Sequence, residues 1–237
     1  EVNILTIEDP VEIQMDGLNQ SQVHSDINYT FANGLRTAIR QDPNIIMVGE
    51  IRDRETIEIA IEAALTGHLV LSTIHTNSAT ETLTRIINMG IAPFLMAETV
   101  ELIIAQRLVR KLCDQCKIAD TTPDIHYLEL AKIAIANLHS TDEIAAEKLK
   151  SLQFFKAVGC KECDKIGYKG RLGLYEIMRM SNEIRRLILE KASSIDIEKA
   201  ALKNGMVNLE QAGIIKALNG ETSLEEVYRV AKRMEEY

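Results

Sequence analysis

The sequence predicts an α/β fold with a mostly parallel sheet, followed by a cysteine-containing segment and a helical C-terminal region. Three short runs, at 4–7, 45–49 and 69–74, are continuously apolar or β-branched, as in strands buried on both faces. Apolar residues at helical spacing occur between them, over 31–41 and 54–65. Strand and helix in alternation build right-handed βαβ units, so the three runs predict neighbouring parallel strands.

Local signals predict where these elements end. Asp42-Pro43 ends the first helix, because the residue before a proline is disfavoured in helical conformation. Thr66-Gly67 ends the second helix, directly after the last of its helically spaced apolar residues. Residues 78–88 and 94–105 predict two further helices.

The pattern after Ser181 is helical to the end of the chain. Ser223 and Glu226 have the spacing of a capping box and predict the start of the last helix. We therefore expect a sheet domain, a cysteine domain and a helical domain, with the boundaries 1–105, 106–180 and 181–237.

The composition is that of a globular protein, with 46% apolar and 26% charged residues and a formal net charge of −8. The longest apolar stretches are about half of the ~20 residues that a membrane helix needs, so we expect no transmembrane segment. The acidic balance and the shortness of the basic patch Arg107, Arg110 and Lys111 predict no nucleic-acid partner.

Acidic residues and a histidine follow the predicted strands. Glu12 comes shortly after the first strand, Glu50 ends the second and His75 ends the third. The carboxyl ends of parallel strands share the edge at which α/β sheets bind ligands, so these three side chains are expected to converge in a site. Glu8 and Asp9 lie in the turn before a proline at the same edge. The alternative is that each acid only caps a helix or lies in a solvated turn.

Arg36 and Arg40 lie four residues apart on the first predicted helix. Their guanidinium groups could reach a phosphate, in cis or across a subunit boundary, or could form surface salt bridges. His68 opens the strand that His75 ends, about 23 Å away at ~3.3 Å per residue, so we interpret it as a structural, hydrogen-bonded residue.

All four cysteines lie in two CxxC pairs. Two such pairs predict a tetrahedral Zn²⁺ site with a structural role, because four thiolates leave no open coordination position. Disulfides and a thioredoxin-like redox motif are the alternatives. The predicted ligands are Cys113, Cys116, Cys160 and Cys163.

Five stretches of the chain carry a family resemblance. They are ILTIEDPVE (4–12), GLRTAIRQDPNIIMVGEIRDRET (34–56), GHLVLSTIHTNSA (67–79), QRLVRKLCDQC (106–116) and GCKECDKIGYKGRLGLYEIM (159–178). Taken in order, these stretches resemble the secretion ATPases, which are the hexameric RecA-like motors of type II secretion and type IV pilus assembly. The cysteine pairs favour the secretion and pilus-extension branch over the retraction motors.

The resemblance implies roles for the predicted site residues. Glu50 matches the Walker B acid, which binds Mg²⁺ through water, and Glu12 matches an acid proposed as general base. His75 matches a residue that senses the γ-phosphate, and Arg36 and Arg40 match arginines near subunit contacts. The family further implies ATP as ligand, a homo-hexamer, an inner-membrane platform protein as partner, and a cytoplasmic location at the periphery of that membrane.

The sequence contains no G-x-x-x-x-G-K-[ST] phosphate loop. In the family this loop precedes the motif that matches 8–12, so we expect the chain to be the C-terminal portion of a longer motor and to be inactive alone. Two other functions remain open. One is a non-catalytic, zinc-stapled adaptor module, and the other is a DNA-processing ATPase of the same superfamily.

Overall fold

The structure is a computed structural model that describes residues 2–138, 149 and 152–235. The chain divides into two compact units, which are described separately. The first unit contains Glu1–Thr76, Glu81–Glu101 and Arg185–Ala192. The second unit contains Asn77–Thr80, Leu102–Ile184 and Ser193–Tyr237. The three-part division at 1–105, 106–180 and 181–237 stays a prediction.

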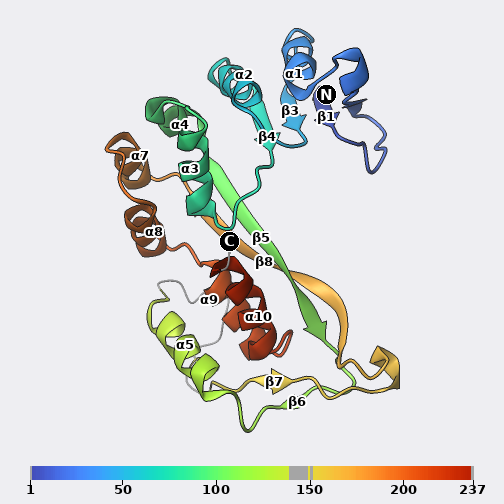
Figure 1. The fold of residues 1–237 in the computed structure, drawn as a ribbon, viewed down its shortest axis with the longest axis vertical. Helices are drawn as coiled ribbons and strands as arrows, with labels where there is room; N and C mark the ends of the chain where they lie inside the picture. The colour runs from blue at the N-terminus through green and yellow to red at the C-terminus, as the bar shows by residue number, and fades with distance from the viewer. Residues whose placement is uncertain (1, 139–148, 150–151, 236–237) are drawn as a thin grey trace. The chain divides into compact units, whose positions relative to one another are not determined.

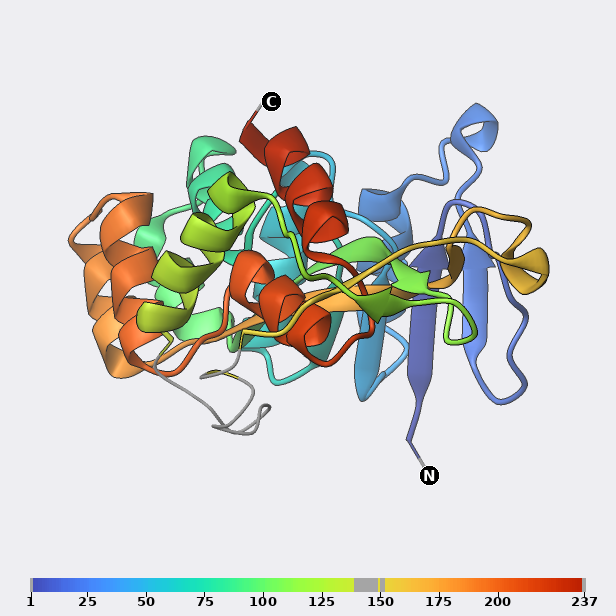
Figure 2. The ribbon, with the colours of Figure 1, turned by 90° about the horizontal axis from the view of Figure 1, so that it is seen from below.

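The first unit contains a parallel sheet with the strand order β2-β1-β3-β4 (Figure 1). Figure 2 shows its N-terminal strands, in blue, side by side. Three of the strands form where the apolar runs predict them. The polar sequence NQSQ of the remaining one, β2, carries no such signal. The strands are β1 (Ile4–Glu8), β2 (Asn19–Gln22), β3 (Ile45–Val48) and β4 (Leu69–Ser72).

Helices α1 (Phe31–Ile39) and α2 (Arg54–Leu65) pack against this sheet and bury Leu35, Ile46 and Val48 completely. The threonine before α1 and the aspartate before α2 cap their helices, because each accepts a hydrogen bond from a backbone N–H three residues on. Both helices therefore begin at the residues that the sequence pattern predicts. A short 3₁₀ helix, η1 (Ser25–Ile27), precedes α1.

The prediction of one helix over 94–105 is wrong in its second half. Helix α3 (Ala79–Asn88) and helix α4 (Pro93–Thr99) form, but the backbone at Val100 is extended. Strand β5 then begins at Leu102. Pairing with a distant strand explains the difference, because β-branched residues such as Ile104 fit a pleated surface when a partner strand is present.

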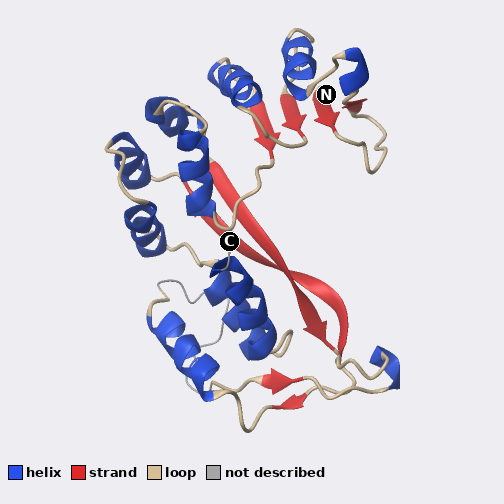
Figure 3. Cartoon of the chain, viewed as in Figure 1, coloured by secondary structure: helices blue, strands red, loops and turns tan. Residues whose placement is uncertain are grey.

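The main feature of the second unit is a long antiparallel pair of strands, seen as the two long red arrows that twist around each other in Figure 3. The strands are β5 (Leu102–Leu112) and β8 (Tyr168–Arg179). Helices α9 (Leu209–Leu218) and α10 (Leu224–Glu235) contact this pair. Val109 of β5 and Leu174 and Met178 of β8 are buried.

Shorter elements complete the structure. Helices follow Ser181 as the sequence predicts, and its hydroxyl accepts a hydrogen bond from the Ile184 N–H at 3.3 Å. No helix in the described part of the chain has both the length and the apolar character that a membrane crossing requires. Among the described residues, the remaining elements are β6 (Ile118–Ala119), α5 (Ile125–Ala136), β7 (Phe155–Lys156), η2 (Lys161–Cys163), α7 (Asn182–Leu189) and α8 (Ser194–Lys203).

Candidate functional site

The carboxyl ends of the parallel strands lie level with one another. The register pairs Ile7 with Val48, and Val48 with Ser72. Val48 and Ser72 are the last residues of their strands, and Ile7 is the last but one of its strand. The Gly49 N–H donates to the Ile7 carbonyl oxygen at 2.7 Å and carries the pairing one residue further. Glu50 therefore emerges from the sheet at its carboxyl edge, where ligands bind in folds of this class.

Glu50 and His75 meet at this edge. The His75 Nε2 lies 3.4 Å from a carboxylate oxygen of Glu50. The His75 side chain is 92% exposed, whereas that of Glu50 is 15% exposed. The imidazole is thus open to solvent, and a ligand at the edge could reach both groups.

Arg52 pairs with Glu50 and lies near a second acid. Its guanidinium donates to the Glu50 carboxylate, and its Nη1 lies 3.8 Å from Asp9 Oδ2. The hydrogen bond from Arg52 is the largest influence that lowers the pKa of Glu50 from its ordinary value of 4.5, with smaller contributions from the charges of Arg52 and His75. Glu50 is therefore ionised at neutral pH. The sequence pattern alone does not predict this pairing, although Arg52 lies two residues from Glu50.

The structure does not bring Glu12 into contact with this pair. Glu12 is exposed in the loop after β1, and within the described residues its carboxylate makes no hydrogen bond or ion pair. Glu8 is tied into the sheet, because its Oε1 accepts hydrogen bonds from Thr6 Oγ1 at 2.6 Å and Gln20 Nε2 at 3.0 Å. The convergence of all three predicted side chains thus stays a prediction.

Two arginines lie on the exposed side of α1. The Arg36 guanidinium donates to Glu55 of α2 at 2.6 Å, and both side chains are largely exposed. Such a pair contributes little to stability. Arg40 is exposed at the end of the same helix. His68 is hydrogen-bonded as expected, with its Nδ1 2.9 Å from the Ala63 carbonyl oxygen.

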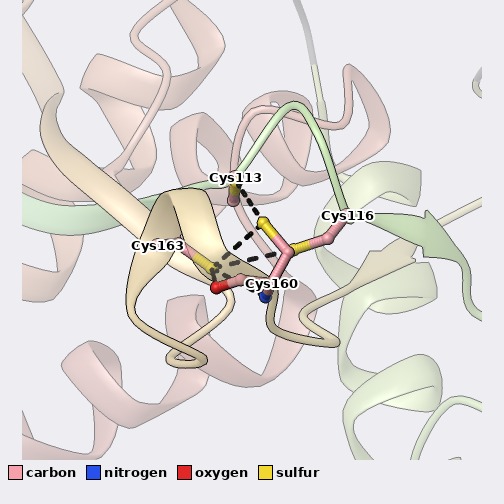
Figure 4. Close-up of side chains that lie close together, drawn as sticks. All are labelled: Cys113, Cys116, Cys160 and Cys163. Carbon is pink, nitrogen blue, oxygen red and sulfur yellow. Dashed lines mark hydrogen bonds between the residues drawn. The ribbon is translucent and has the colours of Figure 1, made fainter.

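The four cysteines converge on one point (Figure 4). Cys113 and Cys116 come from the end of β5 and the turn after it, and Cys160 and Cys163 come from η2 and the residue before it. All four sulfur atoms lie within 4.8 Å of one another. Three of the separations are 3.7–3.8 Å, far longer than the ~2.05 Å of a disulfide.

These separations fit one tetrahedral metal ion. Four sulfurs about 2.3 Å from a central ion lie about 3.8 Å from one another. Backbone N–H groups also point at the sulfurs: those of Cys160 and Gly167 donate to Cys163 Sγ at 3.2 Å. The hydrogen bond from Cys160 is the main cause that lowers the pKa of the Cys163 thiol to about 7, whereas burial raises that of Cys160 to about 11. The four cysteines can hold a metal ion.

Glycine is required at one turn of this cluster. Gly159 has a φ of +109°, and a Cβ there would lie 2.4 Å from the Lys165 carbonyl oxygen. The backbone N–H of Gly159 donates a hydrogen bond to Cys116 Sγ at 3.3 Å. The backbone conformation that brings the thiols together therefore requires glycine at position 159.

A buried carboxylate connects α10 to β5. The Ser223 hydroxyl accepts a hydrogen bond from the Glu226 N–H at 3.1 Å and caps the helix as predicted. The Glu226 side chain, however, binds the guanidinium groups of Arg110 and Arg229 at 2.6 Å each and is fully buried. Burial alone would raise the pKa of Glu226, but the hydrogen bonds from Arg229 and Arg110 lower it to about 2.

Glu176 is a second buried acid that sequence analysis missed. Its carboxylate accepts hydrogen bonds from the backbone N–H of Ala79 at 2.7 Å and of Leu209 at 3.3 Å, which are the first residues of α3 and α9. The alternation of Leu174, Glu176 and Met178 on the buried face of β8 is the signal that could have found it.

The fold and site define a class: a mixed α/β protein with an acid and a histidine at the carboxyl edge of a parallel sheet, a four-cysteine cluster and C-terminal helices. The family described as "Type II/IV secretion system protein" matches residues 1–229. The chain belongs to this family.

Relatives with assigned names agree with this class. The type IV pilus assembly ATPase PilB of Acinetobacter baylyi is 49% identical over 96% of this chain and 38% of its own length. The type II secretion system protein E of Aeromonas hydrophila is 41% identical over 97% of this chain and 43% of its own length. The chain therefore spans well under half of the length of these relatives.

A solved structure has the same fold. The pilus retraction motor PilT with bound ADP aligns with a TM-score of 0.65 and 26% identity, over 100% of this chain and 55% of PilT. The expected α/β fold with a parallel sheet, a cysteine cluster and C-terminal helices is confirmed, and its structural relatives are motor ATPases of the PilT type.

Proposed function

We propose that this chain is the C-terminal part of the ATPase domain of a motor that drives type IV pilus assembly or type II secretion. The observation that carries the proposal is the Glu50–His75 pair at the carboxyl edge of a parallel sheet, in a member of this family. Relatives at 41–49% identity carry the names of pilus assembly ATPases and of a secretion system protein.

The chemistry proposed for the edge is phosphoryl transfer to water, in which positioning and charge neutralisation do most of the work. The ionised carboxylate of Glu50 suits Mg²⁺, which prefers oxygen ligands and is often held through water. Glu12 takes the proton of the attacking water, and the exposed ring of His75 donates a hydrogen bond to a γ-phosphate oxygen. Mg²⁺, when bound with ATP, supplies the positive charge that offsets the phosphates.

The other predicted residues act around this centre. Glu8 and Asp9 order the turn beside the nucleotide, with Asp9 held near Arg52. Arg36 and Arg40 face a neighbouring subunit or a phosphate bound there. Arg36 gives up its weak surface ion pair with Glu55 to make this contact.

The four-cysteine cluster is proposed to hold a structural Zn²⁺. The donor set is all sulfur, the spacing fits a tetrahedron, and no ligand position is left for substrate. Metal analysis of the purified protein should give one zinc per chain. Substitution of two cysteines should remove it, and recovery of a different metal would correct the assignment.

The polypeptide 1–237 by itself is proposed to bind ATP weakly and to hydrolyse it negligibly. Its sequence has no G-x-x-x-x-G-K-[ST] loop, whose backbone N–H groups and lysine hold the β- and γ-phosphates. A turnover of this polypeptide comparable with that of the full-length protein would contradict the proposal.

In the full-length protein we propose a homo-hexamer at the cytoplasmic face of the inner membrane that acts on a membrane platform protein. No nucleic acid is expected as partner, because the net charge is −8. Turnover stimulated by DNA would favour a DNA-processing ATPase instead. Absence of turnover in the full-length protein would favour a zinc-stapled adaptor.

The decisive experiment compares two glutamates in the full-length protein. Glu50→Gln should reduce kcat by about 10²-fold or more, because it removes the charge beside the reacting phosphate. Glu58→Gln is the matched control, since Glu58 is a half-exposed residue of α2 paired with Arg54. Both variants should melt at the temperature of the wild type. Full turnover in Glu50→Gln would show that the assignment of Glu50 is wrong.

A further inference from the structure

Two glutamines of β2 hold the loop that carries Glu12. Residues two apart in a strand point to the same face, and the register places Gln20 opposite Thr6 and Gln22 opposite Glu8 of β1. The loop between β1 and β2 includes Glu12, whose own carboxylate is exposed. The hydrogen bonds of the two glutamines end on this loop.

The bonds hold the backbone on both sides of Glu12. On one side, the Val11 N–H donates to Gln22 Oε1 at 3.2 Å. On the other side, Gln20 Nε2 donates to the Ile13 carbonyl oxygen at 3.1 Å. The two residues adjacent to Glu12 in the chain are thus each tied to β2.

Gln20 uses both ends of its amide. Its Oε1 accepts from the Met15 N–H at 2.7 Å, and its Nε2 also donates to Glu8 Oε1 at 3.0 Å. One side chain therefore joins the loop to the last residue of β1 and needs a donor and an acceptor together. Gln22, by contrast, uses only its side-chain oxygen, which accepts the hydrogen bond from the Val11 N–H.

We propose that Gln20 is a positioning residue for Glu12, with Gln22 in a lesser supporting role. The inference rests on the proposed function, in which Glu12 is the general base. A general base must lie within hydrogen-bond reach of the water that it deprotonates, and a displacement of about 1 Å can cost about 10²-fold in rate. Without Gln20, the exposed loop loses the hydrogen bonds that hold its backbone at Ile13 and Met15, close to Glu12 in the chain.

The difference between the two glutamines supplies a matched pair of variants. Gln20→Glu keeps the size and the acceptor but loses the donor, and its carboxylate would face the oxygens of Ile13 and Glu8. Gln22→Glu keeps the only group that its described bond uses. We expect Gln20→Glu to lower kcat of the full-length protein by about 10–100-fold with the KM for ATP unchanged, and Gln22→Glu to change kcat less than about twofold.

A double-mutant cycle with Glu12→Gln separates positioning from general destabilisation. If Gln20 acts through Glu12, adding Gln20→Glu to Glu12→Gln should lower kcat by less than about twofold more. Independent, multiplicative losses would overturn the inference while leaving the role of Glu12 intact. Full turnover in Glu12→Gln would instead overturn the proposed base and the inference with it.

Hydrogen exchange of the same full-length variants provides a readout that does not depend on activity. Gln20→Met removes every hydrogen bond of this side chain without adding charge and serves where Gln20→Glu fails to fold. The amide of Met15, and the peptide that contains Glu12, should exchange faster in Gln20→Met than in the wild type, with an unchanged melting temperature. Unchanged exchange in this loop would overturn the proposal.

Discussion

The sheet edge around Glu50 and the four-cysteine cluster are organised in opposite ways. In the cluster, four sulfur atoms lie within 4.8 Å of one another and backbone N–H groups already point at them. At the edge, the His75 ring is 92% exposed, and Glu12 lies in an exposed loop. The fold brings the four cysteines together, whereas it leaves His75 and Glu12 open to solvent at the sheet edge.

This difference fits the functions that we propose for the two sites. A structural metal stabilises the folded state most when its ligands are held in place before it binds. A catalytic edge must admit a nucleotide and release its product, so its groups lie at a surface. The same contrast separates two carboxylates: Glu226 is fully buried between arginines, whereas Glu50 is partly exposed beside Arg52.

Replacement of one of the four cysteines, the proposed zinc ligands, tests the contrast with the largest expected effect. Cys163→Ser should abolish stoichiometric zinc and lower the melting temperature by about 10 °C or more, because metal binding in such sites is coupled to folding. Metal analysis and calorimetry measure both. Glu162→Gln, an exposed neighbour in η2, is the control and should retain the metal. A stable, cooperatively folded Cys163→Ser protein would show that the cluster is not needed for folding.

The turn at Gly159 is expected to be the next most sensitive position. Gly159→Ala should destabilise by about 3 kcal/mol or more, because a positive φ is combined with a clash against the Lys165 carbonyl oxygen. Gly170 also has a positive φ, of +80°, but a Cβ there meets no atom within 4 Å. Gly170→Ala should therefore cost only about 1 kcal/mol. Equal losses in urea unfolding would mean that the backbone at Gly159 can relax.

Glu226 should matter to stability in a pH-dependent manner. Glu226→Gln should cost about 2–3 kcal/mol, below the usual loss for a buried pair, because the side chains of Arg110 and Arg229 are 43% and 41% exposed. The folded pKa of Glu226 is about 2, against 4.5 ordinarily. Its contribution is therefore complete above about pH 4.5 and is lost as the pH falls toward 2.

Unfolding measured between pH 6 and pH 2.5 checks this prediction. The wild type should lose stability over that range more steeply than Glu226→Gln, which has no carboxylate to protonate at this position. Glu225→Gln changes the exposed neighbour and should keep the slope of the wild type. Parallel pH profiles for the wild type and Glu226→Gln would contradict the assigned cause.

Arg52 should show the smallest effect on stability and a clear effect on Glu50. Arg52→Gln removes the hydrogen bond that is the main cause of the low pKa of Glu50, so that pKa should rise toward 4.5. The melting temperature should stay within about 1 °C of the wild type, because the Arg52 side chain is 61% exposed and an ion pair that is open to solvent on one side contributes little. The carboxyl ¹³C shift of Glu50, followed against pH and assigned with Glu50→Gln, measures the change. An unchanged pKa would exclude Arg52 as its cause.

Much of the first unit could be predicted from local sequence. Helix α2 covers Arg54–Leu65 as the apolar spacing predicts, and the structure adds the Asp53 cap at its start. The three apolar strands also form where they are expected. Strand β2 could not be predicted, because its polar sequence NQSQ is stabilised by pairing with β1 rather than by an apolar pattern.

The candidate sites were predicted to different degrees. The CxxC spacing identified all four cysteines, because each pair is local and the metal geometry supplies the rest. Parallel topology predicted that Glu12, Glu50 and His75 converge at one edge. The structure shows the contact of Glu50 with His75, and the convergence with Glu12 stays a prediction. The pairing of Arg52 with Glu50 could not be predicted, because rotamers near a strand end depend on neighbours from other strands.

The sequence by itself determined the family, the alternation of helices with parallel strands, the four-cysteine cluster and the helical C-terminal region. Only the tertiary structure decided that the segment after α4 becomes β5 and that Glu226 binds Arg110, 116 positions away. It likewise decided that Gln20 holds the loop of Glu12. Capping, turns and periodicity act within a few residues, whereas these contacts form only when distant segments pack and bury one another's polar groups.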